Sequence, residues 1–273
     1  MSNVTPTHAT ASNPYSPAVR LLAIPLLVYL AWLLETFLLA GMPRLLEEPD
    51  PVAFAVYTGI SCIFTGMILP LLCIRKAFLS GAVNMFQIGF SSSRRTLILC
   101  SLIGIAGYAL VLLFSPFGPD RLAFAGACLL LLPTAAASVM VCWALFGTHI
   151  QAFFREGGAV LSIPTGIVTT SILFAAAIVA VNPAIRMEGS LFWPVCIGMG
   201  AALFFFAVRD VCATVMVVTG LLILSGTVIP DSFSWQAISP AVWLSSLLAG
   251  AALGAIPVYL HRNYTTIVVR TQD

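Results

Sequence analysis

Long apolar runs, interrupted only by short clusters of charged residues, recur along almost the whole sequence. Eight of them reach about 20 residues, the length that an α-helix needs to cross roughly 30 Å of hydrocarbon. A soluble domain could not cover this much apolar surface, because its exterior must face water and 60% of the 273 residues are hydrophobic. We therefore expect an all-α, polytopic membrane protein with eight transmembrane helices in one bundle. The expected spans are residues 19–41, 52–74, 96–115, 122–148, 158–181, 190–208, 211–230 and 240–260.

Basic residues sort to one side of these spans. With an even number of spans both termini share a side, and that side carries nine of the twelve Lys and Arg residues. Since Lys and Arg are enriched in cytoplasmic loops, we expect both termini to be cytoplasmic. The first residues are polar and lack the basic start of a cleavable leader, which favours the plasma membrane of a prokaryotic cell.

The segments outside the spans complete the expected organisation. Residues 1–17 are expected to form a disordered polar tail and residues 263–273 a short cytoplasmic tail, around a single transmembrane domain at 18–262. Within that domain, the loop at 75–95 begins and ends with basic pairs and is moderately apolar between them. This pattern favours an amphipathic helix on the cytoplasmic lipid surface, where its basic ends meet anionic head groups.

Small residues at four-residue spacing predict close helix contacts. Ser246, Gly250 and Gly254 form such a face on the last span, and Gly198 and Ala202 form another on the sixth. We expect both faces to pack within one chain. Self-association, or a membrane-protein partner at the face on the last span, is the alternative. The lipid bilayer is the other expected partner, whereas a net charge of +2 gives no indication of nucleic acid.

Few charged or titratable side chains fall inside the spans, where such groups are costly and usually functional. Glu35 is the only acidic residue within a span and is a candidate proton or cation site; the alternative is a protonated carboxyl bonded to a neighbouring helix. His149 ends the fourth span, and Glu156 follows two helical turns later on a similar face. Arg209 and Asp210 separate the sixth and seventh spans, as a buried ion pair or, as we favour, as an ordinary solvated turn.

No motif with a known chemistry adds to these candidates. HExxH, GxGxxG and GxxxxGK[ST] are absent, and no histidine lies in the membrane interior. A catalytic zinc ion needs three protein ligands, commonly including histidines. The seven cysteines lack CxxC spacing and are expected to pack between helices. We therefore assign no catalytic residue, no cofactor and no metal ligand.

Three segments stand in an order and spacing that resemble a known family. The first is the basic loop that ends in the Ile-Gly-Phe element at 88–90 and continues to Arg94 and Arg95. The second is LFGTHIQAFFREGG, followed by a helix containing SILFAAAI, and the third is GMGAALFFFAVRDVCATVMVVTG. Together they are similar to the CPBP family of intramembrane proteases, which includes CAAX-processing, bacteriocin-processing and Abi-like proteins. The resemblance implies a divergent member of that family.

The family's catalytic motifs are missing from the matching positions. Its EExxxR motif corresponds to Val141–Phe146, which contains no charged residue. Phe174 matches the Phe of its FxxxH motif, but Ile178 stands where the histidine belongs, and the last histidine corresponds to Thr219 or Gly220. In the family, these glutamates and histidines organise a water molecule for peptide hydrolysis. The resemblance therefore implies a pseudoenzyme that has lost these motifs.

Three hypotheses about function follow. The first is a CPBP-like protein without protease activity that has a binding, scaffold or regulatory role. The second is a small transporter or channel that uses Glu35. The third is an active intramembrane peptidase with an unusual residue set: His149, Arg155 and Glu156. An unchanged flux in Glu35→Gln would argue against the second, and peptide cleavage that is lost in His149→Ala would favour the third.

The membrane assignment has a direct test. We expect the purified chain to aggregate when detergent is removed, because its apolar helices then face water. Size-exclusion chromatography with and without detergent measures this. A chain that stays dispersed and helical without detergent contradicts the assignment.

Overall fold

The computed structural model describes residues 17–42, 45–46, 49–79, 85–90, 93–114, 121–154, 158–182, 191–225 and 239–270, and the secondary structure in these ranges is helical. Within these described ranges, five helices are long and apolar enough to cross a membrane, and two shorter apolar helices accompany them. The prediction of an all-helical membrane protein is thereby confirmed at this coarser level. The five lie at Leu22–Gly41, Pro51–Phe78, Ala123–Phe153, Gly158–Val181 and Pro240–Leu260.

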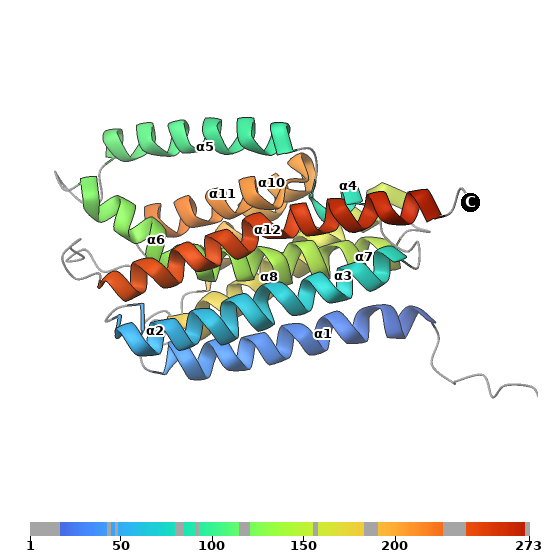
Figure 1. The fold of residues 1–273 in the computed structure, drawn as a ribbon, viewed down its shortest axis with the longest axis horizontal. Helices are drawn as coiled ribbons and strands as arrows, with labels where there is room; N and C mark the ends of the chain where they lie inside the picture. Colours follow the sequence, from blue (N-terminus) through green and yellow to red (C-terminus); the bar gives the residue numbers. More distant parts are fainter. Residues whose placement is uncertain are drawn as a thin grey trace, which may run out of the picture.

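The helices follow the predicted apolar runs in order, and some continue through wider π-helical segments, denoted η. The bounds are α1 (Pro17–Thr36) with η1 (Phe37–Gly41); α2 (Pro51–Tyr57), η2 (Thr58–Ile68) and α3 (Leu69–Leu79); α4 (Met85–Ile88); α5 (Ser93–Phe114); α6 (Arg121–Ser138), η3 (Val139–Gly147) and α7 (Thr148–Phe153); α8 (Gly158–Val181); α10 (Phe192–Val208); α11 (Val211–Leu224); and α12 (Pro240–Arg270). Long axes of the helices run in roughly one direction (Figure 1), as in a membrane-spanning bundle.

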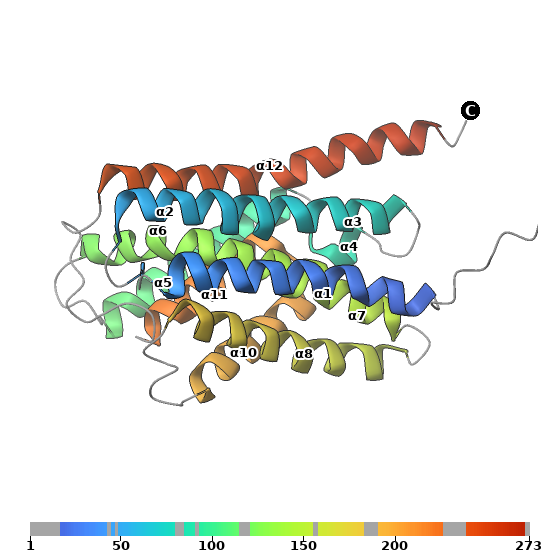
Figure 2. The same ribbon diagram turned by 90° about the horizontal axis from the view of Figure 1, so that it is seen from below.

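The continuous helix made of α6, η3 and α7 forms the centre of the bundle. In its most apolar stretch 89% of residues are buried, against 28–44% in the other four long helices. Figure 2 shows α6 and α7 running through the middle, with α12 on one side and α8 on the other. An apolar helix that is buried all round belongs in a core, whereas its neighbours each keep one apolar face for lipid.

The helix α5 lies at one edge of the bundle and α1 at the opposite edge (Figure 1). Among the described helices, α11 is the main neighbour of α5. Large side chains of α5 are strongly exposed, with Leu97 and Ile105 at 69% and Leu113 at 76%. Exposed apolar surface of this extent marks a face that contacts lipid or a ligand.

Among the described π-helical segments, η2 and η3 contact each other, and buried hydroxyl groups bond across the helices nearby. Thr36, next to η1, shares a 2.8 Å hydrogen bond with Ser61 of η2. Tyr57, next to η2, shares a 2.9 Å hydrogen bond with Thr134 of α6. π-Helical turns are rare and frequently occur at functional sites. Pro133 lies inside α6, about one turn and a half before η3 begins.

Two expected helix ends differ from the structure. Arg75 and Lys76 lie within α3, which continues to Leu79, and Arg75 donates a 2.7 Å hydrogen bond to the hydroxyl of Tyr259. The described part of the 80–92 loop contains only one short helical turn, α4. At the other end of the chain, α12 runs to Arg270, so residues 263–270 of the expected tail at 263–273 are helical. Residues 1–16 of the expected tail at 1–17 lie outside the described residues, and Pro17 begins α1.

Small residues bring helices into close contact inside the chain. A Cβ added at Gly198 of α10 would lie 2.9 Å from the backbone oxygen of Ser171 in α8. On α12, Ser246 is fully buried and Gly250 faces Leu132 of α6, while Gly254 is exposed. Packing within one chain therefore occupies most of the expected small-residue faces, and Ser246 is not on a free surface.

The contact between α8 and α10 predicts opposite effects for two neighbouring glycines. Gly198→Ala should destabilise the protein by about 1–3 kcal/mol, because the new methyl group overlaps the backbone of α8. Gly200→Ala is the matched control: its Cβ would meet its nearest atom at 3.9 Å, and alanine stabilises a helix by roughly 0.5–1 kcal/mol. Unfolding by SDS titration from a mild detergent, followed by circular dichroism, measures both. Equal effects of the two substitutions would contradict the close contact.

Candidate functional site

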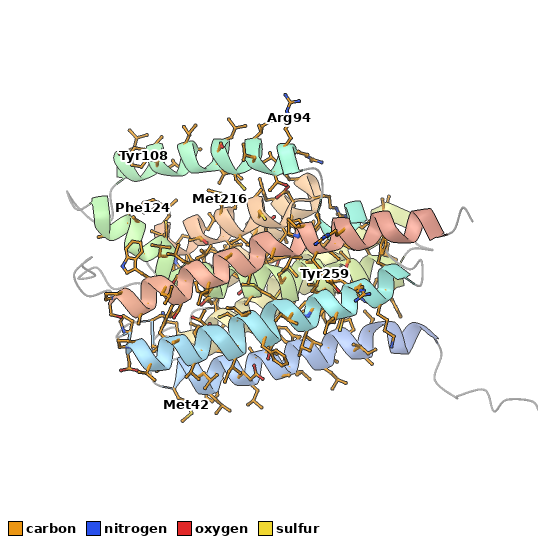
Figure 3. The ribbon with its side chains drawn as sticks, viewed as in Figure 1. Met42, Arg94, Tyr108, Phe124, Met216 and Tyr259 are labelled. Atoms are coloured by element: carbon orange, nitrogen blue, oxygen red, sulfur yellow. The ribbon has the colours of Figure 1, made fainter. Side chains whose placement is uncertain are left out.

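A long cavity of about 490 Å³ lies between α5, α6 and α11. We call it the apolar groove, because its walls are almost entirely hydrocarbon. The side chains of Tyr108, Phe124 and Met216 come from the three helices and surround the space beneath α5 (Figure 3). Tyr108 is 47% exposed, so the groove has an accessible rim on the lipid-facing side. Cavities that bind small molecules are typically about 300–1,000 Å³ and mostly apolar, as this one is.

A second cavity of about 560 Å³, which we call the polar pocket, lies between the first turns of α5 and α11 and the middle of α12. Its walls carry the carboxylate of Asp210 beside hydroxyl and thiol groups, whereas no charged residue lines the apolar groove. α12 contains Pro257 and bends partway along (Figure 2), as proline-containing helices do. The residues that define the polar pocket include Thr96, Ser101, Asp210, Cys212, Gly254 and Pro257.

Asp210 is the charged group of the polar pocket, and local structure fixes its position. It is the N-cap of α11, where its Oδ1 accepts a 2.9 Å hydrogen bond from the backbone N–H of Ala213. The hydroxyl of Thr96 at the start of α5 donates to Oδ2 of Asp210. Asp210 is only 1% exposed, so its charge sits in surroundings of low dielectric, where it acts strongly on other charges.

Arg209 bonds to residues of two distant segments. Its guanidinium donates to the backbone oxygen of Gln87 at 3.0 Å and to Oε1 of Gln151 at 2.8 Å, and it lies 4.9 Å from the ring centroid of Phe206. Burial lowers the pKa of Arg209 to about 10. This pKa is still well above 7, so the guanidinium is protonated at neutral pH. The connection between α10 and α11 is short, as expected, but it is buried rather than solvated.

Gly89, from a distant part of the chain, contacts the connection between α10 and α11, which we call the corner. Its backbone oxygen accepts a 2.9 Å hydrogen bond from the N–H of Val211, and its φ of 88° lies in the left-handed region. A Cβ at this position would lie 2.9 Å from the ring of Phe205. Only glycine satisfies both conditions without strain, so the loop before α5 is held against the corner.

Glu35 lies on the other side of the bundle from the two cavities, in α1. The neighbouring Thr36 bonds to Ser61, but the Oε2 atom of Glu35 is buried without a hydrogen-bond partner among the described residues. Trp32 Nε1 and Thr58 Oγ1 are likewise buried without a hydrogen-bond partner among the described residues. Buried polar atoms are normally bonded, so each of these three atoms is an exception to the rule.

His149 is buried in α7, with 4% of its surface exposed. Its Nδ1 lies 2.7 Å from the backbone oxygen of Leu145, an arrangement in which Nδ1–H donates within its own helix. Arg155 and Glu156, the other members of the unusual peptidase set, lie outside the described residues.

The positions that match the protease motifs do not gather around one cavity. Trp143, at the centre of Val141–Phe146, is fully buried and packs on Phe174 with ring centroids 5.1 Å apart. Ile178 is 1% exposed within the same apolar core. Thr219 and Gly220, by contrast, line the apolar groove together with α5 and α6.

Sequence reasoning found Asp210 but missed the residues that surround it. Thr96 and Gly89 are more than 100 positions away from it along the chain, and no local pattern links them to it. A signal existed for the helix start, because Asp before an apolar run is a typical N-cap. Cys100 and Cys212, expected only to pack between helices, both line the polar pocket.

Among the described residues, no group of three or more His, Cys, Asp or Glu side chains is placed to hold a metal ion. Comparisons with protein-family models, with curated proteins and with solved structures found no match for this chain.

Arg209 stabilises the fold through its side-chain hydrogen bonds, but its left-handed backbone, with φ at 55°, is strained. Two substitutions separate these two effects. Arg209→Ala and Arg209→Gly both lose the hydrogen bonds to Gln87 and Gln151, each worth roughly 1.5–3 kcal/mol for a charged donor. Only glycine also relieves the strain of a positive φ, worth roughly 1–2 kcal/mol. We therefore expect Arg209→Gly to unfold at a higher SDS fraction than Arg209→Ala, and below wild type. The reverse order would contradict the left-handed geometry.

Proposed function

We propose that this chain is a non-hydrolysing integral membrane protein that binds an apolar membrane component in the apolar groove. Its role is then one of binding, scaffolding or regulation on a CPBP-like helical framework. The observation that carries the proposal is the contrast between the positions that match the protease motifs and the apolar groove. Val141–Phe146 and Ile178, which match two of the protease motifs, are buried in the packed core, whereas the groove beneath α5, which Thr219 and Gly220 line, is hollow and has an accessible rim.

The lack of room for water at the motif positions supports a non-hydrolytic role. Peptide hydrolysis needs a water molecule held by groups that move protons. The rings of Trp143 and Phe174 pack against each other with a tilt of 40°, and Ile178 is nearly fully buried in the same core. A hydrocarbon interior packed in this way neither holds nor activates water.

The eight-span topology is part of the same proposal. α5 has 22 residues and is about 33 Å long, which is enough to cross the hydrocarbon. α10 and α11 have 17 and 14 residues, or about 26 Å and 21 Å, and only Arg209 and Asp210 connect them. Two apolar helices with so short a connection fit the bilayer best as a hairpin. Both termini then lie on the cytoplasmic side.

A second candidate function is transport through Glu35. The buried and unpartnered Oε2 atom, beside the hydroxyl pair of Thr36 and Ser61, favours it. Glu35→Gln should abolish a proton or cation flux into proteoliposomes if the carboxyl carries it. Flux that is unchanged in this variant removes the candidate.

The apolar groove provides the main test of the proposal. Native mass spectrometry from a mild detergent should find one phospholipid retained per wild-type chain. Gly107 lines the groove and has open space around its Cβ position, so Gly107→Phe should fill the cavity without a clash. We expect the retained lipid to fall about tenfold, a loss of about 1.4 kcal/mol in binding.

Gly59→Phe is the matched control, because Gly59 is an exposed helical glycine with open space, on η2 and not among the groove residues. It should retain lipid as the wild type does. Wild-type protein without retained lipid, or equal losses in both variants, would contradict the proposed function.

A further inference from the structure

The apolar groove occupies one half of the length of the bundle. On α5 its lining runs from Ile103 to Leu110, and it begins about 15 Å from the first residue of a helix that is about 33 Å long. On α11, which starts beside the first turn of α5, the lining runs from Met216 to Leu224, over about 12 Å. Half of the hydrocarbon is about 15 Å thick. The groove therefore lies within one leaflet, on the side away from Arg94 at the start of α5 (Figure 3).

Met216 closes the groove at its inner end, near the middle of the bundle. Its methyl carbon lies 3.4 Å from the Cβ position of Gly104 on α5, which is an ordinary van der Waals contact. One turn back along each helix, Cys100 and Cys212 line the polar pocket instead. Met216 is thus a floor that separates the groove from the polar pocket.

Two glycines on neighbouring helices leave the groove hollow beyond this floor. Gly107 of α5 and Gly220 of α11 line it, and nothing lies within 4 Å of either Cβ position. Along the rim, Tyr108 and Leu110 are 47% and 40% exposed. A chain can therefore enter the groove sideways from the surrounding lipid and extend as far as Met216.

The lining of the groove offers little to a polar ligand. Among the described residues, no charged side chain lines it. The hydroxyl of Thr219 already donates a 2.8 Å hydrogen bond to the backbone oxygen of Val215 in its own helix. A peptide would bring N–H and C=O groups that need partners inside hydrocarbon, whereas an acyl chain brings none. The flexible thioether of Met216 can also adapt to the end of such a chain.

We infer that the apolar groove binds one acyl chain of a lipid from the leaflet opposite the basic start of α5, with the terminal methyl group of the chain against Met216. In the topology proposed above, this is the non-cytoplasmic leaflet. Lipid chains run from the head groups to the midplane, so a chain from this leaflet lies along the groove with its free end at the floor. Met216 then limits the length of chain that fits. The inference rests on the proposed function of the groove and adds the leaflet, direction and length of the bound chain.

The direction of the chain can be measured in proteoliposomes. The probes are phospholipids with a photoreactive diazirine either beside the ester or at the terminal carbon of one chain, and mass spectrometry of peptides locates the crosslinks. We expect the terminal diazirine to label Met216 and Leu132, and the diazirine beside the ester to label Leu110 and Phe124 at the other end of the groove (Figure 3). The reverse order, or equal labelling of both ends by both probes, overturns the inference.

The length limit is tested by removing the floor. Delipidated protein receives equal amounts of lauroyl and stearoyl phospholipids with one head group, and native mass spectrometry measures the retained ratio. In Met216→Ala we expect the ratio of stearoyl to lauroyl lipid to rise about tenfold over wild type, equivalent to 1.4 kcal/mol. Met199→Ala is the matched control and should keep the wild-type ratio, because Met199 is exposed on α10 and does not line the groove.

The remaining outcomes separate this inference from the proposed function. A ratio that is unchanged in Met216→Ala, or that rises equally in Met199→Ala, overturns the inference, while lipid that is still lost in Gly107→Phe leaves the groove function standing. If Met216→Ala does not fold, the order of crosslinks in the wild type decides. A wild-type protein with no retained lipid and no crosslinks in the groove overturns both.

Discussion

The fold depends on one constraint: within hydrocarbon, every backbone N–H and C=O group must find its partner inside the protein. Helices satisfy it within each segment, and the hydroxyl groups of this chain follow the same rule. Thr148, Thr170 and Thr214 each donate to a backbone oxygen of the preceding turn. Because lipid gives no hydrophobic drive between helices, close approach at residues such as Gly198 then holds the bundle together.

The corner between α10 and α11 applies this constraint to charged groups. Asp210 is bonded by the helix that it caps and by Thr96 of α5, and Arg209 is bonded by two distant segments. These bonds gather the loop at Gly89, the start of α5 and the end of α7 at one point. They also set the distance between α5 and α11, and so the shape of both cavities.

Hydropathy was sufficient to predict that the chain is helical and where most helices lie, since the cost of burying polar groups in lipid dominates the pattern. Helix ends were less predictable: α3 and α12 continue beyond their apolar runs, as Lys and Arg side chains extend from a helix to water. The two cavities were not predictable, because they depend on how far α5 stands from α11. Asp210 was recognised as a candidate, but its burial comes from residues more than 100 positions away.

Shielding of the α10–α11 corner has a consequence for how the protein responds to its medium. Dissolved ions weaken interactions between charges at a surface, but they act much less on groups withdrawn from water. Arg209 and Asp210 are 8% and 1% exposed, so high ionic strength should leave this corner almost unchanged. Arg94, which extends outward, has no such protection, and its attraction to anionic membranes should fade as salt is added.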